Sequence, residues 1–183
     1  IPGWITLMHD SGYNRFYSQD DLSYYCPSAN KYIDIDMSEK ELSFKMSIAS
    51  YGTIEPHWSA SLIDLGDGVA GIELHSVLKP ELNPIDGSII EIVHQAIDTI
   101  ESSGYKALVI SGDNNNFSAG ANLNLIVDAC HRKDYESINT FTEHIQNILQ
   151  ALRFSSFPVV AAPYGLVLGG GCETINACNK IIA

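Results

Sequence analysis

The sequence is poor in basic residues. Its 183 residues carry 10 Lys and Arg against 22 Asp and Glu, which gives a formal net charge of −12 and a pI near 4.7. Proteins that bind nucleic acids or anionic membranes through a charged surface need a cluster of Lys and Arg. We therefore expect neither a nucleic-acid partner nor an anionic-membrane surface.

Long hydrophobic runs are also missing. No stretch approaches the roughly 18 apolar residues that cross a membrane as a helix, so we expect no membrane span. The opening stretch IPGWITLMH is too short for a secretory signal peptide and lacks a basic start. Because the first residue is Ile rather than Met, we expect the sequence to be cut from a longer protein.

Cysteine is scarce, and no metal-ligand pattern is present. The four cysteines show no C-x-x-C spacing and no secretory context, which favours reduced thiols and a cytoplasmic location. The six histidines lack the spacing of metal ligands, and Cys130 beside His131 is a weak signal alone. We expect no metal site.

Two regions differ in pattern. Residues 1–58 hold six of the nine tyrosines, short polar clusters and little periodicity. We predict an irregular N-terminal connector or docking segment there, with one short strand or helix and with GTIEPHW as its exit. Residues 59–183 carry regular patterns and are predicted to form a separate unit.

Residues 59–183 predict an α/β fold, because short apolar runs alternate with segments of helical period. The predicted strands are ASLIDL, VAGIELHS, KALVISG, PVVAAP and KIIA. The predicted helices lie near 86–104, 121–130, 134–154 and 170–178. The order is ββαβααβαβ, and we expect the fold to be truncated at its C-terminal end. The third helix is predicted to bury Ile138, Phe141, Ile145, Ile148, Leu149 and Leu152.

One motif suggests a nucleotide site and is rejected. Residues 66–71, GDGVAG, match the dinucleotide fingerprint G-x-G-x-x-G. That fingerprint requires a helix after it, so that the pyrophosphate meets the helix N-terminus. Here the following residues, IELHS, alternate like a strand, so we predict a hairpin turn.

Two glycine-bearing loops each follow a predicted buried strand and open a predicted helix. They are NNFSAGANL at 115–123 and YGLVLGGGCE at 164–173. A helix N-terminus leaves N–H groups without partners, and its dipole favours negative charge. Two such ends brought together would stabilise an oxyanion, and a buried Glu173 would move a proton. The alternative is that the loops are packing devices and Glu173 only complements the helix dipole.

The segments NNFSAGANL, FPVVAAPYGLVLGGGCE and ACNKIIA, in this order, resemble the crotonase or enoyl-CoA hydratase/isomerase family. The resemblance covers residues 59–183 and implies an acyl-CoA-binding domain. Its fold would be a crotonase-like β-β-α spiral, truncated at its C-terminal end. Members of this family stabilise a thioester enolate in an oxyanion hole.

Matched by position, the resemblance assigns roles to nine residues. The two oxyanion donors would be the N–H groups of Ala121 and Gly170, and Glu173 would be one of two hydratase carboxylates. The stretch KPELNPID resembles a loop that lies along CoA, so Lys79 and Leu82 would contact CoA. The other implied substrate contacts are Ser118, Ala119, Gly120 and Gly169.

The sequence departs from the family pattern in two places. Asn122 stands where many members carry Asp, and the second hydratase carboxylate would fall beyond Ala183. The helices that support family trimers would also fall there, so a homo-oligomer is an open expectation. The implied reaction is hydration of 2-enoyl-CoA to 3-hydroxyacyl-CoA in fatty-acid β-oxidation. The alternatives are enoyl-CoA isomerisation or other one-base enolate chemistry, and a non-catalytic acyl-CoA-binding or assembly module.

The first residues, IPGWITLMHDSGYNRFY, resemble the connector of bacterial multifunctional proteins. In those proteins a 3-hydroxyacyl-CoA dehydrogenase precedes a crotonase domain. The resemblance implies a parent protein that also oxidises 3-hydroxyacyl-CoA with NAD. NAD is expected only in that dehydrogenase domain, whereas this segment is expected to need no cofactor and to take acyl-CoA as its substrate.

Overall fold

The structure, a computed structural model, describes residues 2–19, 23–35, 43–77 and 79–183. Its first elements are α1 (Gly3–Asp10), β1 (Ser23–Cys26), β2 (Lys31–Asp34), α2 (Phe44–Tyr51) and β3 (Thr53–Pro56). The elements that follow are β4 (Ala60–Asp64), β5 (Val69–Leu74), α3 (Gly87–Ser103), β6 (Ala107–Ser111), α4 (Leu123–Arg132), α5 (Tyr135–Arg153), β7 (Val159–Ala161), α6 (Gly170–Ala177) and β8 (Lys180–Ile181).

A six-stranded sheet with the order β3-β4-β5-β6-β7-β8 forms the centre of the larger body. Strands β3, β4 and β5 are antiparallel neighbours, whereas β5 to β8 run parallel. Parallel neighbours need crossover connections, and these contain α3, then α4 with α5, then α6. The carboxyl ends of β6 and β7 therefore meet at one edge of the sheet, where both glycine-bearing loops begin.

The order of elements from β4 onward is ββαβααβαβ, so the predicted α/β organisation is confirmed. The turn between β4 and β5 places Gly66, Asp67 and Gly68 at φ values of 84°, 54° and 77°. A strand, β5, follows this turn. The G-x-G-x-x-G match is therefore a hairpin turn, as predicted.

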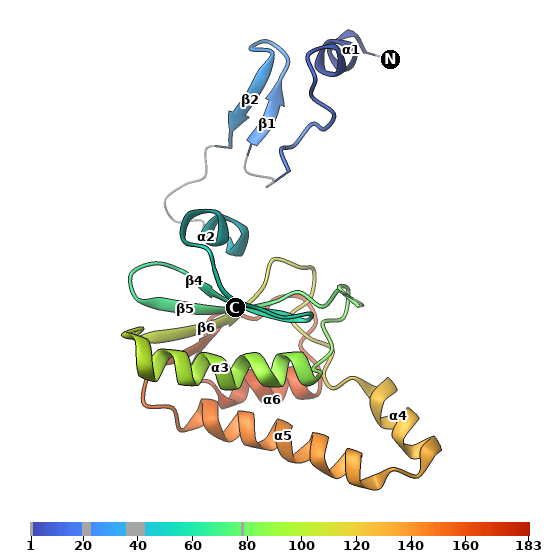
Figure 1. Ribbon diagram of the computed structural model, residues 1–183, viewed down its shortest axis with the longest axis vertical. Helices are drawn as coiled ribbons and strands as arrows, with labels where there is room; N and C mark the ends of the chain where they lie inside the picture. The colour runs from blue at the N-terminus through green and yellow to red at the C-terminus, as the bar shows by residue number, and fades with distance from the viewer. Residues whose placement is uncertain (1, 20–22, 36–42, 78) are drawn as a thin grey trace.

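Helices α3, α5 and α6 lie together against the sheet (Figure 1). Asp86 is the N-cap of helix α3, and its carboxylate accepts the Ile89 N–H and the Ser59 hydroxyl. The helix ends at Gly104 in the left-handed conformation. Its buried residues form the largest share of the core and are Ile89, Ile90, Ile92, Val93, Ala96 and Ile100.

Helix α5 is less buried than predicted. Ile148 and Leu152 are buried, whereas four other predicted inward residues are only half-buried: Ile138, Phe141, Ile145 and Leu149. The physical reason is visible in Figure 1, where the first half of α5 extends past the sheet toward α4, which projects from the body. That half of α5 has α4 for a neighbour instead of the sheet core.

The N-terminal part holds more regular structure than the sequence predicts. Strands β1 and β2 pair antiparallel, and the ring of Tyr13 packs against those of Tyr25 and Tyr32. The predicted exit segment GTIEPHW contains β3, which pairs with β4 in the main sheet. Strands of four residues show too few alternations to be recognised by period. Residues 20–22 and 36–42 of the predicted connector lie outside the described residues.

Helix α2 is held on the main body by Asp113, in the loop after β6. One carboxylate oxygen of Asp113 accepts the Phe44 N–H at 3.3 Å, and the other accepts the Lys45 N–H at 3.0 Å. A carboxylate at a helix N-terminus is favoured by the helix dipole. The Phe44 ring packs over Gly71 of β5, where a Cβ would come within 3.0 Å of the ring.

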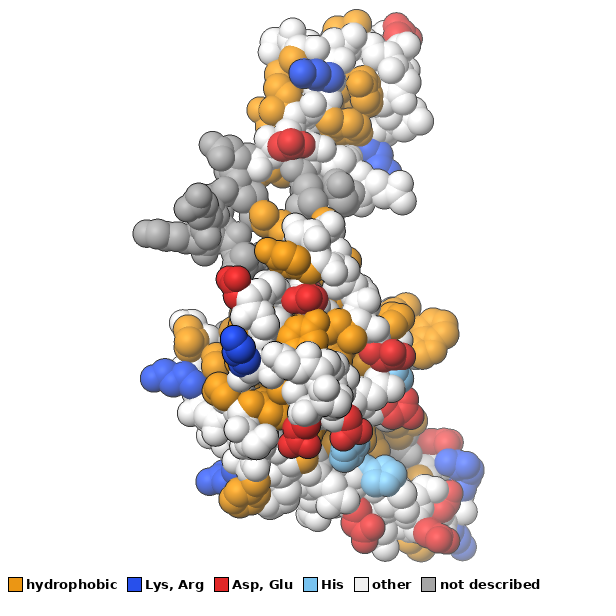
Figure 2. All heavy atoms as spheres, turned by 60° about the vertical axis from the view of Figure 1, so that its left-hand side comes forward, with side chains coloured by type: hydrophobic (Ala, Val, Ile, Leu, Met, Phe, Trp, Pro, Cys, Tyr) orange, Lys and Arg blue, Asp and Glu red, His pale blue; other side chains and the backbone are white. Residues whose placement is uncertain are grey.

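The surface agrees with the acidic composition. Figure 2 shows acidic side chains spread over the visible face of the larger body. Within the described ranges, no helix is both long enough and apolar enough to cross a membrane.

Candidate active site

Three chain segments run side by side at the sheet edge where the glycine-bearing loops begin. Isolated parallel bridges join Ile85 to Ala121 and Ser118 to Val167. In these bridges the Ile85 N–H donates to the Gly120 carbonyl at 2.8 Å, and the Leu168 N–H donates to the Ser118 carbonyl at 2.9 Å. The segment around Ser118 therefore lies between the other two and brings both predicted donor loops together.

The N–H of Ala121 points away from its bridge partner. Both hydrogen bonds with Ile85 are made by the neighbours of Ala121. The Gly120 carbonyl accepts the Ile85 N–H, and the Asn122 N–H donates to the Ile85 carbonyl at 2.9 Å. Within the described residues, the Ala121 N–H itself donates to no protein acceptor. It is therefore free to donate to a ligand.

The prediction that Ala121 opens a helix is wrong. Helix α4 begins at Leu123, and Asn122 is its N-cap, with its side chain accepting the Asn124 N–H at 3.2 Å. Asn122, at the position where the sequence resemblance implies Asp, thus caps the helix. Ala121 lies before the cap in extended backbone, so it owes its orientation to the bridge with Ile85.

The N–H of Gly170 lies at a helix start, as predicted. Gly170 is the first residue of α6, and Gly169, at a φ of 46°, is its N-cap. In the described part of the chain, the Gly170 N–H has no protein acceptor. The dipole of α6 adds partial positive charge at this position.

The two free N–H groups lie close together. A Cβ built on Gly170 would be 3.5 Å from the Ala121 nitrogen, and one built on Gly120 would be 3.0 Å from the Gly170 nitrogen. With standard bond lengths, the Ala121 and Gly170 nitrogens are therefore within about 6.5 Å of each other. This spacing is compatible with two donors sharing one oxygen.

A pocket of about 220 Å³ opens beside Ala121. Five predicted site residues line it: Lys79, Leu82, Ala119, Gly120 and Ala121. Its other lining residues are Pro84, Asn122, Leu123 and Asn124. The Ala119 N–H donates to the Leu82 carbonyl at 2.7 Å, which ties the predicted CoA loop to the donor loop. Among these lining residues, Lys79 carries the one ionisable side chain.

Glu173 is exposed, and the prediction of a buried carboxylate is wrong. Helix α6 buries Gly171, Thr174 and Ala177, at a spacing of three. This face leaves Glu173 on the outer side of the helix. Glu173 is one turn from Gly170 on the same helix and is not among the residues that line the pocket beside Ala121.

Ser118 and Gly169 also lie outside the lining of that pocket. Ser118 is 1% exposed, and its hydroxyl makes two hydrogen bonds within the protein. Gly169 is exposed at the start of α6. Their predicted contacts with substrate stay predictions.

Asn83 was not identified from the sequence, although it organises the loops around the site. It is fully buried at a φ of 43°. Its side-chain oxygen accepts the Ser76 N–H at 2.9 Å, and its side-chain nitrogen donates to the Asn116 carbonyl at 2.8 Å. The signal available in the sequence was the Asn-Pro pair at 83–84, which is typical of a tight turn.

Two half-buried titratable groups lie on the segments that carry the site. Burial raises the pKa of the Tyr164 hydroxyl to about 12, and Tyr164 begins the loop that leads to Gly170. Burial also raises the pKa of the Cys178 thiol to about 12, just after α6. Both groups are therefore neutral near pH 7 and contribute no charge to the site.

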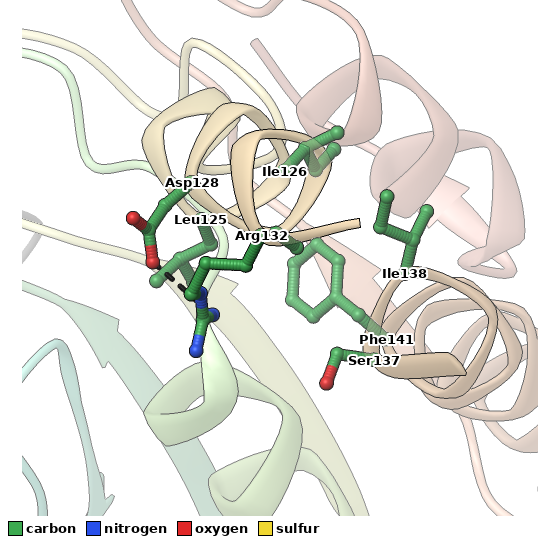
Figure 3. A pocket seen from close by; sticks show the side chains of 8 residues that line it. Leu125, Ile126, Asp128, Arg132, Ser137, Ile138 and Phe141 are labelled. Carbon is green, nitrogen blue, oxygen red and sulfur yellow. Dashed lines mark ion pairs between the residues drawn. The ribbon is translucent and has the colours of Figure 1, made fainter. Parts of the chain in front are cut away.

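A second pocket, of about 210 Å³, lies between α4 and α5 (Figure 3). Its walls are largely apolar and include Leu125, Ile126, Ala129, Ile138 and Phe141. An ion pair between Asp128 and Arg132, at 3.1 Å, lies at its side. It shares no lining residue with the pocket beside Ala121.

Metal ligation finds no support in the described part of the chain, where no three His, Cys, Asp or Glu side chains gather at a common point.

Comparison with known proteins gives a consistent result. The chain is 34% identical over its full 183 residues to a probable 3-hydroxyacyl-CoA dehydrogenase of Bacillus subtilis, of which it spans 23%. It is 30% identical over 116 residues to a probable enoyl-CoA hydratase of the same species, covering 63% of this chain and 43% of that protein. The chain thus spans less than half the length of either relative.

A solved structure agrees with the sequence relatives. The crystal structure of enoyl-CoA hydratase from Thermoplasma volcanium matches with a TM-score of 0.60 and 27% identity, over 69% of this chain and 48% of that one. The crotonase-like α/β fold is thereby confirmed. The model of the family described as enoyl-CoA hydratase/isomerase matches residues 64–183, well over half of the chain. The protein therefore belongs to the enoyl-CoA hydratase/isomerase family, whose members handle acyl-CoA.

Proposed function

We propose that this chain binds a 2-enoyl-CoA thioester and supports its hydration to 3-hydroxyacyl-CoA. The observation that carries the proposal is the pair of neighbouring N–H groups of Ala121 and Gly170, which have no protein acceptor among the described residues. Ala121 lines a pocket together with Lys79 and Leu82, whereas Gly170 is not among its lining residues. Removing one such donor from an oxyanion site typically costs about 10²–10³-fold in kcat. Two donors therefore account for a large part of a rate enhancement.

In the proposed reaction, the oxygen of water forms a bond to the β-carbon of the enoyl group. The electron pair of the double bond shifts toward the carbonyl, and negative charge collects on the thioester oxygen. The N–H groups of Ala121 and Gly170 donate to that oxygen and lower the energy of this state. The attacking water gives up one proton as its oxygen bonds to the β-carbon, and one proton is delivered to the α-carbon, which completes the 3-hydroxyacyl product.

Glu173 is proposed as the general acid or base that handles water or its proton. It follows Gly170 by three residues on α6, and residues at this spacing lie on neighbouring positions of a helix. Its carboxylate is exposed, so it reaches a ligand by side-chain rotation rather than from a preformed buried position.

The CoA part of the substrate is proposed to lie along residues 79–84. Lys79 supplies a positive charge in an otherwise acidic protein, which suits the phosphates of CoA. Leu82 offers an exposed apolar side chain to the same ligand. A parent protein that also oxidises the 3-hydroxyacyl product with NAD is proposed from the name of the B. subtilis dehydrogenase.

A second function is isomerisation of the enoyl double bond by one carboxylate. The pocket beside Ala121 has no acidic side chain among its described lining residues, and Glu173 is the one carboxylate to which the sequence resemblance assigns a role. One-base proton transfer between carbons needs the same oxyanion donors but only a single carboxylate.

The test is turnover of but-2-enoyl-CoA, followed by loss of the ultraviolet absorbance of its conjugated thioester. The saturated butanoyl-CoA serves as a binding control in calorimetry. Binding of both with loss of absorbance supports hydration, whereas binding without any loss contradicts it. Conversion of a 3-enoyl-CoA to the 2-enoyl isomer, without hydration, supports the second function.

A further inference from the structure

The side chain of Ser118 sits at the junction of the two donor loops. Its hydroxyl accepts the Gly120 N–H at 3.1 Å and donates to the Asn83 carbonyl at 2.8 Å. With 1% of its surface exposed, it has little opportunity to contact a ligand. The bond to Gly120 fixes the peptide unit immediately before the Ala121 N–H.

The backbone of Ser118 holds the other donor loop. Its N–H donates to the Leu166 carbonyl at 3.1 Å, and its carbonyl accepts the Leu168 N–H at 2.9 Å. A Cβ on Gly171 would come within 2.8 Å of the Ser118 carbonyl oxygen and 2.9 Å of its Cβ. Ser118 is therefore packed directly against the first turn of α6, beside Gly170.

Asn83 holds the Ser118 side chain by accepting its hydroxyl hydrogen bond. Its side-chain oxygen accepts from the Ser76 N–H at 2.9 Å and from the Asn114 side chain at 3.3 Å. Its side-chain nitrogen donates to the Asn116 carbonyl at 2.8 Å. These bonds leave the Asn83 carbonyl in a fixed position to receive the Ser118 hydroxyl, and a fully satisfied buried polar network of this kind is rigid.

We infer that Ser118, held by Asn83, is a positioning residue that sets the distance and direction between the Ala121 and Gly170 N–H groups. The inference rests on the proposed function, because the two donors matter only if they share an oxyanion. This positioning role does not depend on the substrate contact that the family resemblance implies for Ser118. It acts on the reaction through Gly120 on one side and through the Leu166–Leu168 segment on the other.

The test compares Ser118→Ala with Ser111→Ala in the full chain. Ser111 is also a buried serine, 8% exposed, and its hydroxyl donates to the Ala162 carbonyl at 2.7 Å. Both variants lose one buried hydroxyl, but only Ser118 is bonded to the loop of Ala121. The matched pair thus separates positioning of the donors from a general loss of stability.

The readouts are the shift of the thioester carbonyl stretch of bound but-2-enoyl-CoA, measured by difference infrared spectroscopy, and the split between kcat and KM. We expect Ser118→Ala to lose most of the shift of the thioester carbonyl stretch and to lower kcat roughly 10- to 100-fold. This loss is no larger than the roughly 10²–10³-fold fall in kcat that follows removal of one oxyanion donor. KM should change less than about threefold, since CoA contacts are untouched. Ser111→Ala should keep the wild-type shift and kcat.

A second measurement needs no ligand. In the free protein, the Gly120 amide should exchange with solvent faster in Ser118→Ala than in the wild type, by about tenfold or more for a lost buried hydrogen bond. Should Ser118→Ala fail to fold, Ser118→Cys keeps a weaker donor and acceptor at the same place and is expected to give an intermediate exchange rate and infrared shift.

The outcomes separate the two proposals. A wild-type protein that binds but-2-enoyl-CoA without shifting its carbonyl stretch contradicts the proposed function and removes the basis of the inference. If folded Ser118→Ala shows the same shift of the carbonyl stretch as the wild type, the inference about Ser118 is overturned and the proposed function is not. An equal loss in Ser111→Ala also overturns it, because the effect would then be one of stability. Unchanged Gly120 exchange overturns it independently of any ligand.

Discussion

Gly120 lies directly against Gly170, the residue that carries the second free N–H. A Cβ at Gly120 would come within 3.0 Å of the Gly170 nitrogen and 2.9 Å of the Leu168 carbonyl oxygen. The φ of Gly120 is 95°, a region that L side chains rarely adopt. The approach of the two donor loops therefore depends on the absence of a side chain at this position.

Gly120→Ala is expected to separate the donor loops. The added methyl group meets backbone atoms that cannot rotate away, and the positive φ adds roughly 1–2 kcal/mol of strain. We expect a lower free energy of unfolding, measured by urea denaturation, and a loss of at least tenfold in turnover of but-2-enoyl-CoA. The control is Gly87→Ala, since no atom lies within 4 Å of a Cβ there and the residue begins α3. Equal behaviour of the two variants would contradict the close approach.

Glu173→Gln tests the proposed proton transfer. Gln keeps the shape of the side chain but cannot exchange a proton, so hydration should fall by roughly 10²–10⁴-fold while butanoyl-CoA still binds. Glu143→Gln, on the exposed side of α5, removes the same charge and should leave turnover unchanged. Full activity of Glu173→Gln would remove this carboxylate from the mechanism.

Asp113→Ala should loosen α2 from the main body. The variant removes the carboxylate that accepts the Phe44 and Lys45 N–H groups, while the N-cap Ser43 stays in place. Losing hydrogen bonds to a charged group typically costs about 1.5–3 kcal/mol. Hydrogen exchange should speed up in α2 more than in α3. Asp98→Ala, at an exposed position of α3, is the comparison. Unaltered protection of α2 would show that the Asp113 contact does not hold the helix.

The raised pKa of the Cys178 thiol leads us to expect a lower free energy of unfolding at alkaline pH. Its folded pKa is raised by burial from 9.0 to about 12, so the folded state binds the proton more tightly than the unfolded state. The stabilisation is complete below pH 9 and is lost as the pH rises toward 12. In urea denaturation between pH 8 and 10, Cys178→Ala should show a flatter decline than the wild type. Cys130→Ala, which removes an exposed thiol, should follow the wild-type profile, and a wild-type profile for Cys178→Ala would refute the prediction.

The sequence predicted the order of elements from β4 onward because these elements have strong local signals. Alternation and glycine identified the hairpin around Asp67, and apolar periodicity identified α3. The exposure of Glu173 depends instead on which face of α6 meets the sheet. The spacing of Gly171, Thr174 and Ala177 carried that information, since three small residues at intervals of three form the buried face.

Two other features could not be predicted because they depend on contacts between distant segments. Ala121 is oriented by a bridge to Ile85, 36 positions away, rather than by the helix that follows it. Asn83 is buried by side-chain bonds to Asn114 and Asn116, which no local pattern specifies. The sequence thus predicted two candidate donors whose N–H groups lie close together in the structure, and their role as donors stays a prediction. The helix start that was expected to orient Ala121 was wrong.

The most direct test follows the amide signals of the two donors during a titration with butanoyl-CoA, by proton–nitrogen NMR. If both N–H groups donate to one thioester oxygen, the Ala121 and Gly170 amide protons move downfield together and saturate at the same concentration. A shift of one amide without the other, or of neither while butanoyl-CoA binds, would contradict the shared oxygen.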